Sequence, residues 1–152
     1  MNDKYLRVGI AGISGYSGLT TFEILLNHPN VRVTYVSAGT TKGLVSDIWP
    51  HLLGRTNFVC EPFDGKKAIP LCDLIFLATP HNVSMTIAPQ LLAAGLRVID
   101  LSGDYRLKSL AEYKKWYSTT HTDKKNLKQA VYGLPEYYRP KIKSAKLIAN
   151  PG

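Results

Sequence analysis

Residues 6–18 read Leu-Arg-Val-Gly-Ile-Ala-Gly-Ile-Ser-Gly-Tyr-Ser-Gly, and this stretch decides the fold. The apolar run from Leu6 to Ala11 is typical of a short buried strand, and glycines then recur at every third position through Gly18. The residues behind the last glycine are compatible with a helix. A strand, a glycine turn and a helix in this order are typical of the unit that binds a dinucleotide.

The glycine turn predicts a site for the cofactor phosphates. Glycines let the main chain pass close to a pyrophosphate, and the N-terminus of the next helix offers unpaired N–H groups and a partial positive charge. The spacing differs from the standard G-x-G-x-x-G, so a turn that only packs a helix on a sheet is the alternative. The predicted contacts are Gly12, Ser14, Gly15, Tyr16, Ser17 and Gly18.

Strand-like and helical segments alternate along the chain, which indicates parallel strands covered by helices. We expect an α/β fold of the Rossmann type, doubly wound, with a mostly parallel sheet and helices on both faces. The expected strands are residues 6–11, 31–37, 74–78, 97–101 and 146–149, with a weaker one at 58–63. The expected helices are a segment from the last glycine to about His28, residues 83–94 closed by Gly95, and residues 111–117.

Length and composition suit one globular domain of 152 residues, 45% of them apolar. No apolar stretch approaches the roughly 20 residues that a membrane span needs, and residues 1–4 do not resemble the start of a secretion signal. We therefore expect a cytoplasmic protein without a membrane partner. The two cysteines, Cys60 and Cys72, form no C-x-x-C pair, so we interpret them as buried reduced thiols and expect no metal site.

Most of the net charge of +8 falls after residue 100. Lysine clusters at 114–115 and 124–128 could face nucleic acid, but few aromatic residues are interleaved with them, and a solvated helix face explains them equally well. A basic field also attracts anionic ligands such as a dinucleotide or a phosphorylated substrate. We expect a small-molecule substrate and no nucleic-acid partner.

The end of the second expected strand argues for NADP as the cofactor. An acidic residue there would accept hydrogen bonds from the ribose hydroxyls of NAD. The chain instead has Ser-Ala-Gly-Thr-Thr-Lys-Gly at residues 37–43, which could hold the 2′-phosphate of NADP without charge repulsion. A flexible connection is the alternative. The predicted contacts are Ser37, Thr40 and Lys42.

Two further strand ends carry polar residues, at 79–82 and 100–106, where ligands of open α/β folds bind. Pro80 keeps the preceding residue extended, so His81 and Asn82 either point outward or cap the next helix. Arg106 can hold a carboxylate or a phosphate with two hydrogen bonds. A structural pairing of Arg106 with Asp104 or Asp100 is the alternative.

Six motifs, in this order along the chain, resemble those of N-acetyl-gamma-glutamyl-phosphate reductase. The resemblance covers essentially the whole chain and implies an NADP-dependent acyl-phosphate reductase of arginine biosynthesis, which reduces N-acetyl-glutamyl 5-phosphate to the semialdehyde. The motifs are Gly12-Ile-Ser-Gly-Tyr-Ser-Gly18, Pro50-His-Leu52, Ala78-Thr-Pro-His-Asn-Val-Ser84, Val98-Ile-Asp-Leu-Ser-Gly-Asp-Tyr-Arg-Leu107, Tyr132-Gly-Leu-Pro-Glu136 and Ile148-Ala-Asn-Pro-Gly152.

In this family a nucleophilic cysteine directly follows the Asn-Pro-Gly turn and forms a thioester, and a histidine of a second domain acts as acid and base. We therefore expect residues 1–152 to form the NADP-binding domain, with no catalytic residue and no activity alone. The catalytic and dimerisation domain, expected after residue 152, would make the enzyme a homo-oligomer. The resemblance assigns Thr79, Pro80, His81 and Ser102 to the cofactor, beside the contacts above, and Arg106 and Asn150 to the substrate.

Two other functions stay open at this point. A sister acyl-phosphate reductase, from the lysine pathway or aspartate-semialdehyde dehydrogenase, shares the thioester chemistry with a different substrate. An NADP-binding module that regulates without catalysis is the second. The residues that would select the acyl phosphate mostly lie outside this chain.

Overall fold

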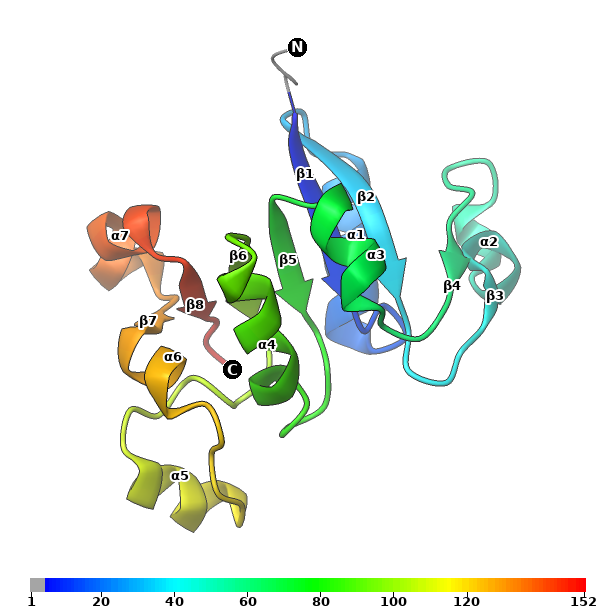
Figure 1. Cartoon of the computed structure of the whole chain (residues 1–152). Helices are drawn as coiled ribbons and strands as arrows, with labels where there is room; N and C mark the ends of the chain where they lie inside the picture. The colour runs from blue at the N-terminus through cyan, green and yellow to red at the C-terminus, as the bar shows by residue number, and fades with distance from the viewer. Residues whose placement is uncertain (1–4) are drawn as a thin grey trace. The chain divides into compact units, whose positions relative to one another are not determined.

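The computed structural model describes residues 5–152 (Figure 1), so residues 1–4, where we saw no secretion signal, lie outside the described part. The chain divides into two compact units, one ending at Ala78 and the other beginning at Thr79. The first unit contains β1 (Leu6–Ala11), α1 (Tyr16–Leu26), β2 (Val31–Ser37), β3 (Gly43–Leu44), α2 (Val45–Ile48), η1 (Pro50–Leu52), β4 (Val59–Cys60), α3 (Gly65–Leu71) and β5 (Leu74–Leu77).

The first unit is built on three parallel strands in the order β2-β1-β5. β1 is central, and its residues Val8, Ile10 and Ala11 are at most 1% exposed, as an apolar run buried on both faces should be. The sequence predicted β1 and β2 with the bounds that they have, and β5 to within one residue.

Helices cover both faces of these strands. The chain passes from β1 through α1 to β2, and then from β2 through α3 back across β1 to β5. Right-handed crossovers in opposite directions place their helices on opposite faces. Figure 1 shows α3 in front of β1 and β2 and α1 behind them. The predicted α/β class with doubly wound parallel strands is confirmed.

The prediction of a third strand at residues 58–63 is wrong in extent and in pairing. Only Val59 and Cys60 form a strand, β4, which pairs with β3 in a separate antiparallel ribbon. The place beside β1 is taken instead by β5. Between β4 and β5 the chain forms α3, whose N-terminus is capped by the Asp64 carboxylate through the N–H groups of Lys66 and Lys67.

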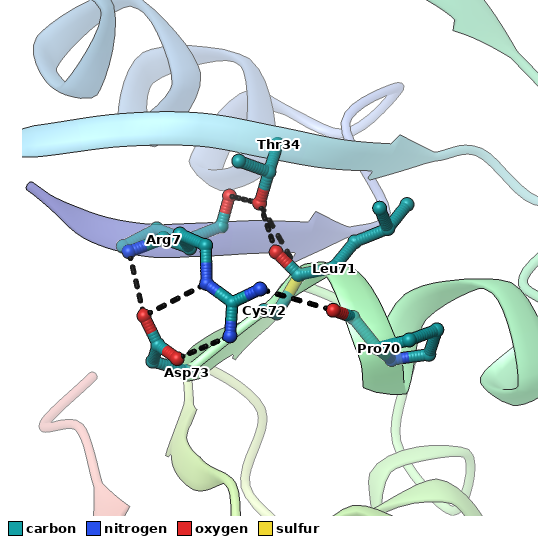
Figure 2. Close-up of polar contacts among 7 residues, drawn as sticks. Arg7, Thr34, Pro70, Leu71, Cys72 and Asp73 are labelled. Carbon is teal, nitrogen blue, oxygen red and sulfur yellow. Dashed lines mark hydrogen bonds and ion pairs between the residues drawn. The ribbon is translucent and has the colours of Figure 1, made fainter. Parts of the chain in front are cut away.

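A polar clamp joins the start of β1 to the turn before β5 (Figure 2). The Arg7 guanidinium donates to both carboxylate oxygens of Asp73, at 3.2 and 2.7 Å, and to the Pro70 carbonyl at 3.0 Å. The main chain adds the bonds from Arg7 N–H to Asp73 and from Asp73 N–H to the Arg7 carbonyl. Thr34 of β2 donates to the Leu71 carbonyl beside it, at 2.8 Å. Three segments far apart in sequence are thus fixed at one end of the strands.

The second unit has three more parallel strands, in the order β6-β8-β7. Its elements are α4 (Ser84–Ala93), β6 (Arg97–Asp100), α5 (Leu110–Tyr117), α6 (Lys124–Gln129), β7 (Val131–Tyr132), α7 (Pro135–Ser144) and β8 (Leu147–Ala149). The predicted helices α4 and α5 and strands β6 and β8 are confirmed to within one residue at either end, and Gly95 follows α4 with φ of +90° as expected of a left-handed cap. The sequence did not predict α6, β7 or α7.

Several expectations about composition can be compared with residues 5–152. Cys60 and Cys72 are both buried and free, as predicted, and burial raises the pKa of both thiols. No helix in this part of the chain combines the length and the apolar character of a membrane span. Within the same residues, no three His, Cys, Asp or Glu side chains gather as a metal site would require.

The clamp predicts a pH-dependent contribution to stability. Bonding to Arg7 lowers the pKa of Asp73 below its ordinary value of 3.8, so the contribution is present above that pH and is lost as the pH falls through the lowered pKa. Asp73→Asn should reduce the unfolding free energy at pH 7 by about 1 kcal/mol, since the pair is partly exposed. Urea titrations at pH 7 and pH 3 measure this.

The difference between wild type and Asp73→Asn should be smaller at pH 3 than at pH 7, because pH 3 lies below the ordinary pKa of 3.8. Asp47→Asn is the control, because this exposed carboxylate on α2 carries the same charge and lies outside the clamp. An Asp73→Asn deficit of equal size at both pH values would contradict an ionic clamp.

Candidate nucleotide-binding site

The glycine turn is held by the end of β2. Gly12 has φ of +96°, a left-handed conformation that favours glycine. The N–H groups of Gly12 and Ile13 both donate to the Ser37 carbonyl, each at 2.9 Å. These two N–H groups are therefore engaged in the fold, and the donors that remain for a ligand lie further along, at the start of α1.

Gly18 brings α1 close to the turn. A Cβ at this position would lie 2.1 Å from the Gly12 carbonyl oxygen, which is far inside van der Waals contact. Gly15 differs, because a Cβ there would meet only the same oxygen, at an ordinary 3.8 Å. Gly18 is therefore a packing glycine that sets how the helix leaves the turn, whereas Gly15 lies on the solvent side.

The N-terminus of α1 is open to an anion. Gly15 is its N-cap, no side chain caps it, and no acidic residue lies in its first turn. Ser14, Gly15, Tyr16 and Ser17 are exposed, and Tyr16 is 96% exposed. An uncapped N-terminus concentrates N–H donors and the positive end of the helix dipole, which is the arrangement that binds a phosphate.

The loop after β2 contains the other predicted contacts of the first unit. The side chain of Ser37 is 1% exposed, so this residue acts in the fold through its carbonyl. Thr40 and Lys42 are exposed. The Ala38 N–H donates to the Glu61 carbonyl at 2.9 Å, and β3 begins at Gly43. The loop is thus anchored at both ends and presents a hydroxyl and a cation to solvent.

In the second unit, His81 is held by the loop that follows β6. The Gly103 N–H donates to His81 Nδ1 at 3.3 Å, and the ring of Tyr117 lies 5.1 Å from the imidazole, centroid to centroid. Thr79 is hydrogen-bonded to Ser84 through the two hydroxyls at 2.9 Å, and Pro80 is exposed. Two expectations were open for His81, that it points outward or that it caps α4. The structure favours the first, because another residue caps α4.

That residue is Asp104, which the sequence suggested only as a possible partner of Arg106. Its side chain is fully buried and accepts hydrogen bonds from the N–H groups of Asn82 and Met85, both at 3.0 Å, and from the Tyr113 hydroxyl at 2.8 Å. Burial of Tyr113 raises the pKa of its hydroxyl above the ordinary value, and the hydrogen bond to the Asp104 carboxylate raises it further. A sequence signal existed, since Asp104 lies in a segment expected at the strand ends, but its partners are 19 and 22 residues away.

Ser102 is occupied within the same network. Its hydroxyl donates to Asp100 at 3.0 Å and accepts from the Asp104 N–H at 3.1 Å, and the residue is 6% exposed. Asp100 is fully buried, and this burial raises its pKa. The hydrogen bonds from Ser84 and Ser102 act in the opposite direction and only partly offset it. Ser102 therefore links the Asp100 carboxylate to the main-chain N–H of Asp104, and any contact with a ligand would use the one lone pair that remains.

The structure brings the two predicted substrate residues together. Arg106 Nε donates to the Asn150 carbonyl at 2.8 Å, and one terminal nitrogen donates to the Leu101 carbonyl at 2.9 Å. The Asn150 N–H donates to the Asp100 carbonyl at 2.8 Å. Arg106 thus joins the carboxyl ends of β6 and β8 through carbonyls, not through Asp100 or Asp104 as the alternative held.

Arg106 keeps its charge uncompensated by a carboxylate. None of the ion pairs found among residues 5–152 involves Arg106. A guanidinium has five N–H donors, and the two bonds to carbonyls leave the others for a ligand. An arginine fixed in this way at two strand ends can receive a carboxylate or a phosphate.

A hollow of the second unit lies elsewhere. A cavity of about 730 Å³ opens among α4, α6, β7 and α7, and none of the predicted site residues lines it. Its wall includes Leu92 and Ala93 at the end of α4 and residues 145–147 at the start of β8. Ligands of parallel sheets bind at the carboxyl ends of the strands, and this cavity is at their amino ends, so we do not assign the cofactor to it.

A strand, glycine turn and uncapped helix, in an α/β chain with parallel strands, define a nucleotide-binding domain of the Rossmann type. The chain belongs to the family described as "Semialdehyde dehydrogenase, NAD binding domain", which it matches over residues 7–145.

Curated relatives are called N-acetyl-gamma-glutamyl-phosphate reductase. The protein from Desulfotalea psychrophila is 47% identical over 148 residues, which are 97% of this chain and 42% of the relative. The protein from Campylobacter hominis is 49% identical over 147 residues, 96% of this chain and 43% of the relative. The chain therefore spans less than half the length of these reductases.

Solved structures of semialdehyde dehydrogenases have the same fold. Aspartate semialdehyde dehydrogenase with NADP from Candida albicans aligns with a TM-score of 0.68 at 16% identity, over 91% of this chain and 36% of the other. Aspartate semialdehyde dehydrogenase II complexed with ASA, from Vibrio cholerae, aligns with a TM-score of 0.61 at 16% identity, over 97% and 42%. At these identities the likeness concerns the fold alone.

Substitutions at Gly18 and Gly15 should differ in how much stability they cost. Gly18→Ala should lower the unfolding free energy by about 2 kcal/mol or more, because the added methyl overlaps the Gly12 carbonyl and α1 must shift. Gly15→Ala should change stability by less than about 1 kcal/mol, because its φ of −87° suits alanine and the space is open. Denaturant titrations of both variants measure this. Equal losses would show that the approach of α1 to the turn is not the constraint.

Proposed function

We propose that this chain is the NADPH-binding part of an N-acetyl-gamma-glutamyl-phosphate reductase. The observation that carries the proposal is the identity of 44–49% to these reductases over nearly the whole chain. The whole enzyme would reduce N-acetyl-glutamyl 5-phosphate with NADPH to the semialdehyde and release phosphate. We assign no catalytic residue to residues 5–152, and the chain by itself should bind the cofactor without turnover.

In this proposal the pyrophosphate binds at the open N-terminus of α1. The exposed hydroxyls of Ser14 and Ser17 lie beside that end, and Gly15 leaves room for a close approach. The uncapped helix end and the absence of an acidic residue in its first turn support this, because an anion there meets no competing charge. Gly12 and Gly18 contribute through the shape of the turn.

The adenosine 2′-phosphate would lie at the loop after β2. The exposed Thr40 and Lys42 support it, since the loop offers a hydroxyl and a cation and no carboxylate between residues 37 and 43. The nicotinamide half belongs, in the same proposal, to the residues that follow β5 and β6, which are Thr79, Pro80, His81 and Ser102. Arg106 and Asn150 would contact the acyl phosphate substrate.

The proposal includes a cytoplasmic homo-oligomer as the working enzyme. Apolar and aromatic side chains that a partner surface would cover support the association, among them Leu53 at 75%, Trp116 at 70% and Tyr137 at 77% exposure. None of the residues of helix α7 is buried, which leaves surface on this helix that a partner could cover.

Cofactor titration tests the binding site directly. The chain should bind NADPH more tightly than NADH, and Lys42→Glu should weaken NADPH by about tenfold or more while leaving NADH nearly unchanged, because the lost interaction is with the 2′-phosphate. Calorimetry or quenching of nicotinamide fluorescence measures both constants. Lys66→Glu is the matched control, since it makes the same charge change at an exposed lysine on α3.

An unchanged NADPH affinity in Lys42→Glu would remove this residue from the site, and a chain that binds neither cofactor would remove the site itself.

Turnover distinguishes the reductases from one another. A version of the chain extended to the length of its relatives should oxidise NADPH with N-acetyl-glutamyl 5-phosphate at least about a hundredfold faster than with aspartyl phosphate, as substrate selectivity built on hydrogen bonds allows. The decrease of NADPH absorbance reports the rate. Preference for aspartyl phosphate would assign the chain to the sister enzyme.

A further inference from the structure

The loop between β5 and α4 is shaped from outside by one buried carboxylate. Asp104 bonds the N–H groups of Asn82 and Met85, one on either side of the start of α4, and both oxygens are used. Helix α4 has no side-chain cap from its own N-cap residue, Val83. Asp104 therefore supplies from a distance the negative group that a helix N-terminus favours.

The same carboxylate supports a backbone conformation that the loop would not keep alone. Asn82 has φ of +73°, in the left-handed region that non-glycine residues rarely adopt. Its N–H is bonded to Asp104, and its side-chain oxygen lies 3.4 Å from the Tyr113 hydroxyl, which also bonds Asp104. Tyr113 is fully buried, so this hydroxyl is fixed where it can orient both groups.

This arrangement also fixes the ring of His81, the residue before Asn82. The Gly103 N–H, directly before Asp104 in the chain, donates to His81 Nδ1. A neutral imidazole that accepts at Nδ1 carries its proton on Nε2. Tyr117 lies against the ring and stacks on Tyr113, with centroids 4.8 Å apart. The loop therefore presents one defined N–H donor.

We propose that Asp104 and Tyr113 are positioning residues that set the affinity for the nicotinamide half of NADPH by holding residues 79–82 in their bound shape. The inference rests on the proposed function, which gives these residues to the cofactor. Within the first unit, β2 and β5 lie on opposite sides of β1. The adenosine end belongs to the loop after β2, so the residues that follow β5 are assigned the opposite end of the dinucleotide.

The test compares two tyrosines and two ligands. Tyr113→Phe removes only the hydroxyl bonded to Asp104 at 2.8 Å. Tyr105→Phe is the matched control, because it removes a similarly buried hydroxyl that is bonded at 2.7 Å to a different carboxylate, Asp123. The ligands are NADPH and adenosine 2′,5′-bisphosphate, which lacks the nicotinamide half. Calorimetry on the whole 152-residue chain gives the affinities, and thermal melting gives the stability of each variant.

Tyr113→Phe should weaken NADPH by about three- to tenfold and change the bisphosphate by less than about twofold. Tyr105→Phe should leave both affinities unchanged even where it lowers the melting temperature. Asp104→Asn, as a second variant, should show the same selective loss of NADPH. A merely structural role would affect both ligands alike.

Parallel losses for the two ligands, or equal behaviour of the two tyrosine variants, would overturn the positioning role while wild-type binding stands. Wild type that binds neither ligand would overturn the proposed function and this inference with it.

Discussion

Two N–H groups of the glycine turn donate to one carbonyl of β2, and these bonds fix where helix α1 begins in the first unit. Gly12 and Ile13 both donate to Ser37, so the turn after β1 is tied to the end of β2 before α1 begins. This bond requires the left-handed Gly12, and the return of α1 past the same residue requires that Gly18 have no side chain. The N-terminus of α1 is open because its N-cap residue is Gly15, which has no side chain to cap it.

In the second unit a carboxylate bonds the N-terminus of a helix. The N-terminus of α4 also lacks a local cap, yet it does not stay open, because Asp104 reaches it from the loop after β6. One helix end therefore has no side-chain cap, and the other is neutralised within the fold.

Sequence reasoning succeeded where the determinants are local and failed where they are distant. The bounds of β1 and β2 followed from apolar runs and alternation, and the cap at Gly95 followed from its place after a periodic segment. Residues 58–63 were predicted as a weaker strand, but the place beside β1 belongs to the more apolar β5, and only Val59 and Cys60 form a strand. Helix α3 had a readable signal, an aspartate N-cap, in Asp64.

The candidate site divides in the same way. Glycines and hydroxyls near the first turn could be assigned from spacing, since their role depends on neighbours within a few residues. Arg106 was singled out for its chemistry, yet its partners, the carbonyls of Leu101 and Asn150, belong to two strand ends that only the fold brings together. Asp104 and Tyr113 were missed because their bonds to the loop before α4 span 19 to 31 residues.

The charges of the second unit explain why its arginine remains available. Asp100 and Asp104 lie within a few residues of Arg106 in sequence, but each is fully buried and accepts hydrogen bonds from N–H and hydroxyl donors. Neither forms an ion pair with Arg106, which bonds neutral carbonyls instead. A guanidinium bonded to carbonyls is held in place without having its charge paired, so the positive charge of Arg106 stays available at the strand ends.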